Sequence, residues 1–238
     1  MNKRIWELDA LRGICILGMV MVHFLYDLGS IGFDTSSRLF LLVQYWGGTA
    51  FVVLSGICVT LGKHHIRRGL IVFTCGMVCT AVTVGMYLLG FADKDIIIYF
   101  GVLHCLGTCM LLWTPLCRCP NLLLGVLGCI FCIAGHLLEQ AILVDFPLLI
   151  PLGFRYPEFS SSDYFPLLPN LGYFLLGALL GKVLYRKKAT LFPKVDSRCL
   201  PVHFLCGCGR HSLLIYLLHQ PLITGILTLI LTVRSNTL

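Results

Sequence analysis

The sequence predicts an all-α fold, a polytopic helical bundle of an integral membrane protein, from three observations. Hydrophobic residues make up 58% of the 238 residues, and charged residues only 12%. The mean hydropathy is +0.89, and a water-soluble domain of this size cannot bury so much apolar surface. Seven apolar stretches approach the ~20 residues that a membrane-spanning helix needs. We therefore expect about seven transmembrane helices in a single domain over residues 1–238.

The seven stretches are separated by short polar or basic connections, and the fifth is the shortest. The first is not a signal-peptide core, because Arg12, His23 and Asp27 interrupt it. The longest connection, Gln140 to Tyr164, predicts a lid, a binding loop or a disordered segment. The expected spans are about Leu11–Leu28, Leu39–Leu61, Gly69–Gly90, Ile97–Leu116, Leu122–Leu138, Phe165–Leu184 and His211–Val233.

Basic residues gather at alternate ends of these spans, fourteen against four. This asymmetry predicts a cytoplasmic N-terminus. It also accounts for the net charge of +7, so the charge does not indicate a nucleic-acid partner. The basic cluster from Lys63 to Arg68 is expected to meet membrane lipid headgroups or to attract a phosphorylated cytosolic ligand.

The thirteen cysteines are expected to be reduced thiols. None falls in a predicted outward loop, and disulfides form in oxidising compartments. Cys129 and Cys132 have the spacing of a metal or redox pair, but no second pair accompanies them. No other tight ligand spacing occurs among the histidines and carboxylates, so we expect no metal.

The first span is the apolar segment that carries several ionisable residues. At ~100° per residue, Asp9, Arg12, His23 and Asp27 fall within an arc of roughly 60°, with Ile16 between them. Ionisable groups at membrane depth normally face a protein interior or a wet cavity. We call these four side chains the polar stripe and interpret it as part of a functional site.

Three histidines lie at compatible depths in the predicted membrane. Counting residues places His23, His104 and His219 about 18, 20 and 12 Å above the cytoplasmic boundary, so one cavity could hold all three. A histidine suits general-base work, and Asp27 could orient His23 and hold the imidazolium that forms. Gln220 beside His219 would form a polar notch. The alternative for each histidine is an interhelical hydrogen bond.

Arg12 has two interpretations. It could snorkel to lipid phosphate while Asp9 caps the helix. It could instead hold an anionic donor molecule. The residues alone leave both open.

Five motifs cover nearly the whole chain: RIWELDALRGICILGMVMVHFLYDL, FVVLSGICVTLG, YFGVLHCLG, NLGYFLLGALLG and GRHSLLIYLLHQP. Together they resemble the heparan-alpha-glucosaminide N-acetyltransferase-like family of bacterial membrane proteins. More distantly, Arg12 and His23, eleven residues apart on one helix, are similar to the pair in membrane acyltransferases that modify surface polysaccharides. The chain departs from the lysosomal heparan-sulfate branch in its first outward loop, where that branch has its catalytic histidine and this chain has none.

The resemblance implies a transmembrane acyltransferase in a bacterial cytoplasmic membrane. It would move an acyl group from cytosolic acyl-CoA to an amine or hydroxyl of an extracytoplasmic sugar or glycan. Acetyl is the acyl group expected first. Arg12, with Asp9, would hold the CoA donor, and His23 would serve as general base or transient acyl carrier. His219 and Gln220 would line the cavity or polarise the thioester carbonyl. The short chain suggests a homodimer or a reduced helical core.

Two other classes of protein are compatible with the polar stripe. One is a small proton-coupled transporter in which buried aspartates and histidines relay protons, although no internal repeat is visible. The other is a non-catalytic membrane scaffold, for which the polar stripe would have no purpose.

Overall fold

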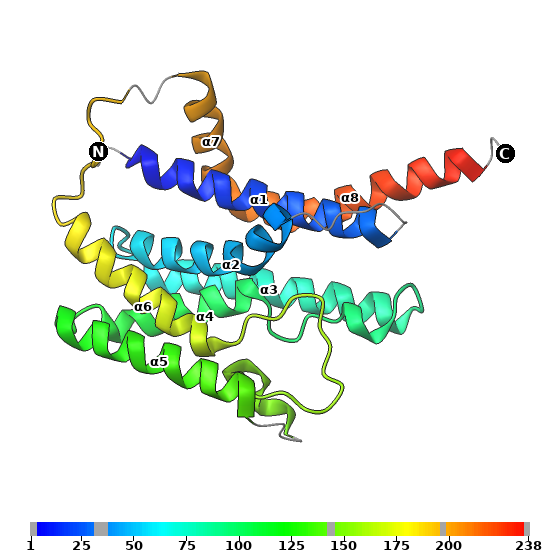
Figure 1. Cartoon of the computed structure of the whole chain (residues 1–238), viewed down its shortest axis with the longest axis horizontal. Coiled ribbons are helices and arrows are strands. Elements are labelled where there is room, and N and C mark those ends of the chain that lie inside the picture. The colour runs from blue at the N-terminus through cyan, green and yellow to red at the C-terminus, as the bar shows by residue number, and fades with distance from the viewer. Residues whose placement is uncertain (1–3, 31–37, 142–145, 196–198, 236–238) are drawn as a thin grey trace. The chain divides into compact units, whose positions relative to one another are not determined.

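The computed structural model describes residues 4–30, 38–141, 146–195 and 199–235. Within these ranges the chain is helical, and the predicted all-α fold is confirmed (Figure 1). The α-helices are α1 (Trp6–Ser30), α2 (Arg38–Val59), α3 (His65–Leu88), α4 (Val102–Leu116), α5 (Asn121–Ala141), α6 (Leu167–Leu184), α7 (Leu200–Arg210) and α8 (Ser212–Ser235), and the 3-10 helices are η1 (Lys94–Ile96) and η2 (Pro147–Leu152).

Six of the described helices are long and apolar enough to cross a membrane, namely α1, α2, α3, α5, α6 and α8. The fourth predicted span, Ile97–Leu116, is helical only from Val102 and has 15 residues. At 1.5 Å per residue this is about 23 Å, less than the ~30 Å of a hydrocarbon core. The protein is thus an integral membrane protein with six candidate spans and one short apolar helix, close to the predicted seven. The cytoplasmic N-terminus stays a prediction.

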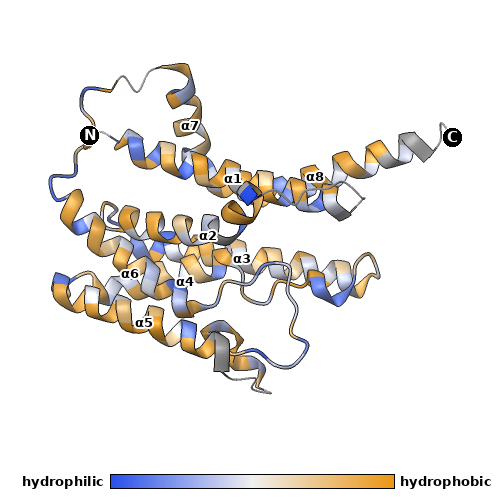
Figure 2. Cartoon of the chain, in the orientation of Figure 1, coloured by the Kyte–Doolittle hydropathy of each residue, from blue (hydrophilic) through white to orange (hydrophobic). Residues whose placement is uncertain are grey.

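The long helices expose apolar side chains on their surface. Only 17% of the most apolar window of α3, 17% of that of α5 and 11% of that of α8 are buried. Figure 2 shows hydrophobic residues along nearly the full length of these helices. Contiguous apolar surface of this extent is unfavourable in water, and helices satisfy their own backbone hydrogen bonds in lipid.

The chain forms two compact units, which we name by their place in the sequence. The terminal unit consists of Met1–Phe51 and Phe192–Leu238, and the central unit of Val52–Leu191. Helices α1, α7, α8 and the first part of α2 belong to the terminal unit. The predicted single domain over residues 1–238 stays a prediction.

In the terminal unit, α7 packs directly against α1. A Cβ atom on Gly13 would clash with a backbone carbonyl of α7, and one on Gly209 would clash with the carbonyl oxygen of Asp9, so the two backbones touch. The Cys206 thiol donates to the carbonyl oxygen of Trp6 at 3.3 Å, and burial raises its pKa, which keeps the thiol protonated. The sequence analysis expected a connection between the sixth and seventh spans here, and the structure has an 11-residue helix.

In the central unit, α5 packs on α6 and α3 on α4. Helix α6 also meets α2 through small residues. A Cβ atom on Gly177 would clash with the carbonyl oxygen of Val53, and one on Gly181 would lie 2.7 Å from that of Ile57. These glycines let the helix backbones approach to contact, which is the usual role of small residues at membrane helix interfaces.

The long connection before α6 lies against the turn that precedes α4. The hydroxyl of Ser161 donates to the carbonyl oxygen of Ile97 at 2.8 Å, and that of Ser162 to Ile96 at 2.6 Å. Asp163 accepts a hydrogen bond from the backbone N–H of Val102 at 3.0 Å. Residues 142–145 lie outside the described residues. The described part of the connection is folded and contacts the N-terminal end of α4.

Candidate active site

The polar stripe of α1 faces α7 and α8 of the terminal unit. Ile16, in the middle of the stripe, is only 2% exposed. At the first end of the stripe, Arg12 Nη1 donates to Asp9 Oδ1 at 3.3 Å and to the carbonyl oxygen of Gly209 at 3.5 Å. Arg12 and Asp9 are 20% and 15% exposed. This end of the stripe therefore joins α1 to the C-terminal end of α7.

The other end of the stripe meets α8. The rings of His23 and His219 lie 4.9 Å apart between centroids, with an angle of 57° between their planes. One turn further along α1, Asp27 Oδ2 accepts a hydrogen bond from Gln220 Nε2 at 3.0 Å. The structure thus brings together four side chains that the sequence separates by nearly two hundred residues. Their catalytic roles stay predictions.

The backbone of α8 sets the orientation of the His219 ring. Its Nδ1 lies 2.6 Å from the carbonyl oxygen of Tyr216, three residues earlier in the helix. A carbonyl only accepts, so Nδ1 carries the proton and Nε2 is the basic nitrogen of the neutral ring. The side chain is 8% exposed. The sequence analysis did not predict this role of the Tyr216 carbonyl. Its only signal in the sequence is the spacing of three residues, which places Tyr216 and His219 on one helix face.

Pro221 follows the His219-Gln220 pair inside α8. Because proline has no N–H, the carbonyl one turn before it loses its helical donor. Gln220 Oε1 is buried and has no hydrogen-bond partner among the described residues. The predicted polar notch therefore contains oxygen atoms that can accept hydrogen bonds, and it lies beside the Asp27 carboxylate. Such a notch can accept hydrogen bonds from an amine or a hydroxyl.

His104 lies in the central unit and has a different environment. It is 2% exposed, and its Nδ1 accepts from the backbone N–H of Gly101 at 3.2 Å, which caps α4. Its Nε2 lies 3.4 Å from the hydroxyl of Thr80, which itself donates to the carbonyl oxygen of Ile98 at 2.6 Å. Both ring nitrogens are thus engaged in joining α3, α4 and the turn between them. Its predicted place in a shared cavity stays a prediction.

Within the described ranges, no group of three or more histidine, cysteine, aspartate or glutamate side chains is arranged to hold a metal ion. The thirteen cysteines, all of them among the described residues, are free thiols. The Cys129 and Cys132 pair belongs to α5, where Cys129 is exposed on the apolar surface. The polar stripe and its α8 partners present imidazole, carboxylate, carboxamide and guanidinium groups.

Comparison with known families shows the class of this protein. The family described as heparan-alpha-glucosaminide N-acetyltransferase, catalytic, matches residues 4–221. The chain belongs to this family. The match confirms the predicted resemblance, and it includes every α1, α7 and α8 contact described above. Comparisons with curated proteins and with solved structures give no match. Membership in the heparan-alpha-glucosaminide N-acetyltransferase family, together with the apolar helices, makes this chain a membrane acetyltransferase.

Proposed function

We propose that this protein transfers an acetyl group from acetyl-CoA, or another acyl group from its CoA thioester, across the membrane. The acceptor is an amine or hydroxyl of an extracytoplasmic sugar or glycan, and the membrane is the bacterial cytoplasmic membrane. The observation that carries the proposal is the pair of imidazole rings of His23 and His219, 4.9 Å apart on two helices. A homodimer is compatible with this function and stays a prediction.

In the proposed reaction, His23 accepts the proton of the acceptor as its nitrogen or oxygen attacks the thioester carbonyl. The tetrahedral intermediate then expels the CoA sulfur, and the imidazolium returns the proton to the leaving thiolate. The products are an acetamide or acetate ester and free CoA. Asp27 lies four residues beyond His23 on the same helix face, where its charge favours the imidazolium.

His219 is the second imidazole of the proposed site. Because Tyr216 holds its Nδ1 proton, Nε2 can accept a proton or an acyl group. A direct transfer would use His219 to relay the proton from His23. A two-step transfer would pass the acetyl group through a transient acyl-histidine on either ring. Gln220 donates one amide hydrogen to Asp27. Its second amide hydrogen could polarise the thioester carbonyl.

Arg12 and Asp9 form the proposed donor end of the site. Arg12 lies eleven residues before His23, about 16 Å along the helix. An arginine presents five N–H groups in a planar fork, a geometry that suits a phosphate of CoA. Asp9 would then fix the guanidinium and would not touch the donor itself.

The experiment is acetyl transfer in proteoliposomes. Purified protein is supplied with labelled acetyl-CoA and a panel of amino sugars and glycans. We expect His23→Ala to lower the transfer rate by about 10²-fold or more. The matched control is His203→Ala, which removes an exposed histidine of α7 and should transfer at the wild-type rate.

Two results would contradict the proposal. Equal transfer by the wild type and by His23→Ala would show that His23 is not the base. Proton-driven uptake of a solute without consumption of any thioester would instead support the small transporter considered in the sequence analysis.

A further inference from the structure

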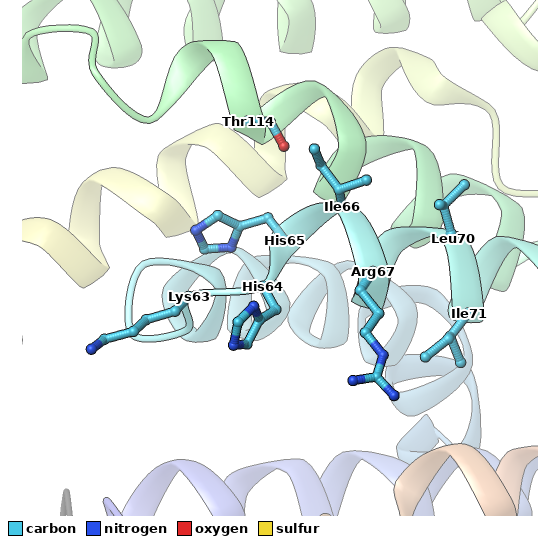
Figure 3. A pocket seen from close by; sticks show the side chains of 8 residues that line it. All are labelled: Lys63, His64, His65, Ile66, Arg67, Leu70, Ile71 and Thr114. Atoms are coloured by element: carbon cyan, nitrogen blue, oxygen red, sulfur yellow. The ribbon is translucent and has the colours of Figure 1, made fainter.

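The central unit contains a cavity of about 750 Å³ at the start of α3. It lies beside the basic cluster that follows α2, and Figure 3 shows the side chains that surround it. The proposed acetyl-transfer site does not use any of them. The lining residues are Lys63, His64, His65, Ile66, Arg67, Leu70, Ile71 and Thr114.

One end of this cavity is positively charged. Lys63, His64 and Arg67 are all exposed, and no acidic residue occurs among the described residues that line the cavity. His64 is the N-cap of α3 and makes no side-chain capping hydrogen bond. The first backbone N–H groups of α3 therefore add to the positive potential of Lys63 and Arg67. This combination attracts a phosphate group.

The rest of the cavity wall is apolar and continues into the membrane. Ile66, Leu70 and Ile71 are 54%, 52% and 47% exposed, and α3 is one of the candidate spans. Figure 3 shows Ile66 and Leu70 above the helix and Arg67 and Ile71 below it. A phosphorylated molecule without an apolar part would gain nothing from this apolar wall. A phosphate attached to a hydrocarbon chain would use both parts.

Two residues that line the cavity carry buried polar atoms. His65 Nδ1 and Thr114 Oγ1 have no hydrogen-bond partner among the described residues. Buried polar atoms are nearly always satisfied by protein, water or ligand. The hydroxyl or glycerol oxygens of a lipid headgroup are groups that could supply such partners.

We propose that this cavity is a binding site for one anionic phospholipid of the cytoplasmic leaflet. Lys63, His64 and Arg67 hold the headgroup phosphate, and an acyl chain lies along Ile66 and Leu70. The chemistry recognised is a phosphate ester joined to a hydrocarbon chain, and its source is the membrane. This inference goes beyond the proposed acetyl transfer and does not depend on it.

The experiment measures lipid bound to the purified full chain by native mass spectrometry during titration with dihexanoyl phosphatidylglycerol. A basic residue near an anionic surface contributes about 1 kcal/mol. The double variant Lys63→Gln/Arg67→Gln should therefore weaken binding by about 30-fold. The matched control, Arg186→Gln/Lys187→Gln, removes the same charge from exposed residues that follow α6 and should bind as the wild type does.

Competition on the wild-type protein separates the possible sources of the phosphate, and it needs no variant to fold. Dihexanoyl phosphatidylglycerol should displace a fluorescent phosphatidylglycerol, whereas glycerol 3-phosphate and CoA should not. Displacement by CoA would assign the cavity to a nucleotide and would overturn the proposal. Equal weakening in the two double variants would also overturn it, because it would mean that only diffuse charge attracts the lipid.

Discussion

His104 and His219 are both buried histidines in apolar helices, at 2% and 8% exposure, but their surroundings differ. His104 engages a backbone N–H with one ring nitrogen and the hydroxyl of Thr80 with the other. Its neighbouring rings are those of Phe73 and Phe100, which do not titrate. His219 is held by the backbone of its own helix, and its ring meets the titratable ring of His23 from another helix.

This difference shows why burial does not identify a catalytic histidine. Hydrogen bonds offset the free-energy cost of desolvating a buried imidazole ring, and those of His104 lie within the central unit. At His219 the hydrogen bond to Tyr216 selects a tautomer and directs the basic nitrogen away from its own backbone. The first arrangement stabilises a helix terminus, and the second suits the acid–base role that we propose for His219.

The largest expected effect is on catalysis at His219. The change His219→Asn keeps an N–H near the Tyr216 carbonyl and removes the basic nitrogen. We expect acetyl transfer to fall by about 10²-fold and the melting temperature in detergent to stay close to the wild type. The distinction between the two histidines would be wrong if His219→Asn lost as much stability as His104→Ala and kept the wild-type transfer rate per folded molecule.

The second effect is on stability at His104. His104→Ala removes the cap on Gly101 and leaves a cavity, and should lower the free energy of unfolding by about 2–4 kcal/mol. His104→Gln is the matched control, because glutamine at the third helical position accepts the same N–H in a capping box. It should cost about 1 kcal/mol or less. Thermal unfolding of the purified variants checks both values, and equal losses would exclude the capping role.

The third effect tests the hydrogen bond between Asp27 of α1 and Gln220 of α8. A hydrogen bond to a carboxylate contributes about 1.5–3 kcal/mol, so Asp27→Ala and Gln220→Ala should each destabilise the terminal unit. Combining the two changes should cost less than their sum, with a coupling of about 1 kcal/mol. Asp27→Ala combined with Gly225→Ala, at a position with nothing within 4 Å, should be additive. Additive losses for Asp27 and Gln220 would mean that the hydrogen bond is not formed in the membrane.

The smallest effect tests how tightly the His104 ring is held. A Cβ atom on Gly76 of α3 would lie 3.0 Å from this ring, whereas one on Gly85 of the same helix would meet nothing within 4 Å. Gly76→Ala should therefore destabilise by about 1 kcal/mol. Gly85→Ala should stabilise by about 0.5–1 kcal/mol through helix propensity. If Gly76→Ala is as stable as Gly85→Ala in thermal unfolding, the ring has room to move.

Much of the fold and part of the site could be predicted because they depend on local periodicity. The 3.6-residue repeat places Asp9, Arg12, His23 and Asp27 on one face whatever surrounds the helix, and hydropathy marks the spans. Helix α4 begins later than predicted, because its cap comes from His104 and its first residue meets Asp163, sixty-one residues away.

The sequence by itself determined that this chain is a membrane helical protein, that one helix carries a polar stripe, and that it resembles a membrane acetyltransferase family. Hydropathy, helical period and motif identity are properties of single segments, so they need no knowledge of neighbours. Tertiary structure alone decided that α8 and α7 cover the stripe, and that His219 meets His23 whereas His104 caps a helix. Those outcomes depend on which backbones can touch, as at Gly13 and Gly209, and no single segment contains that information.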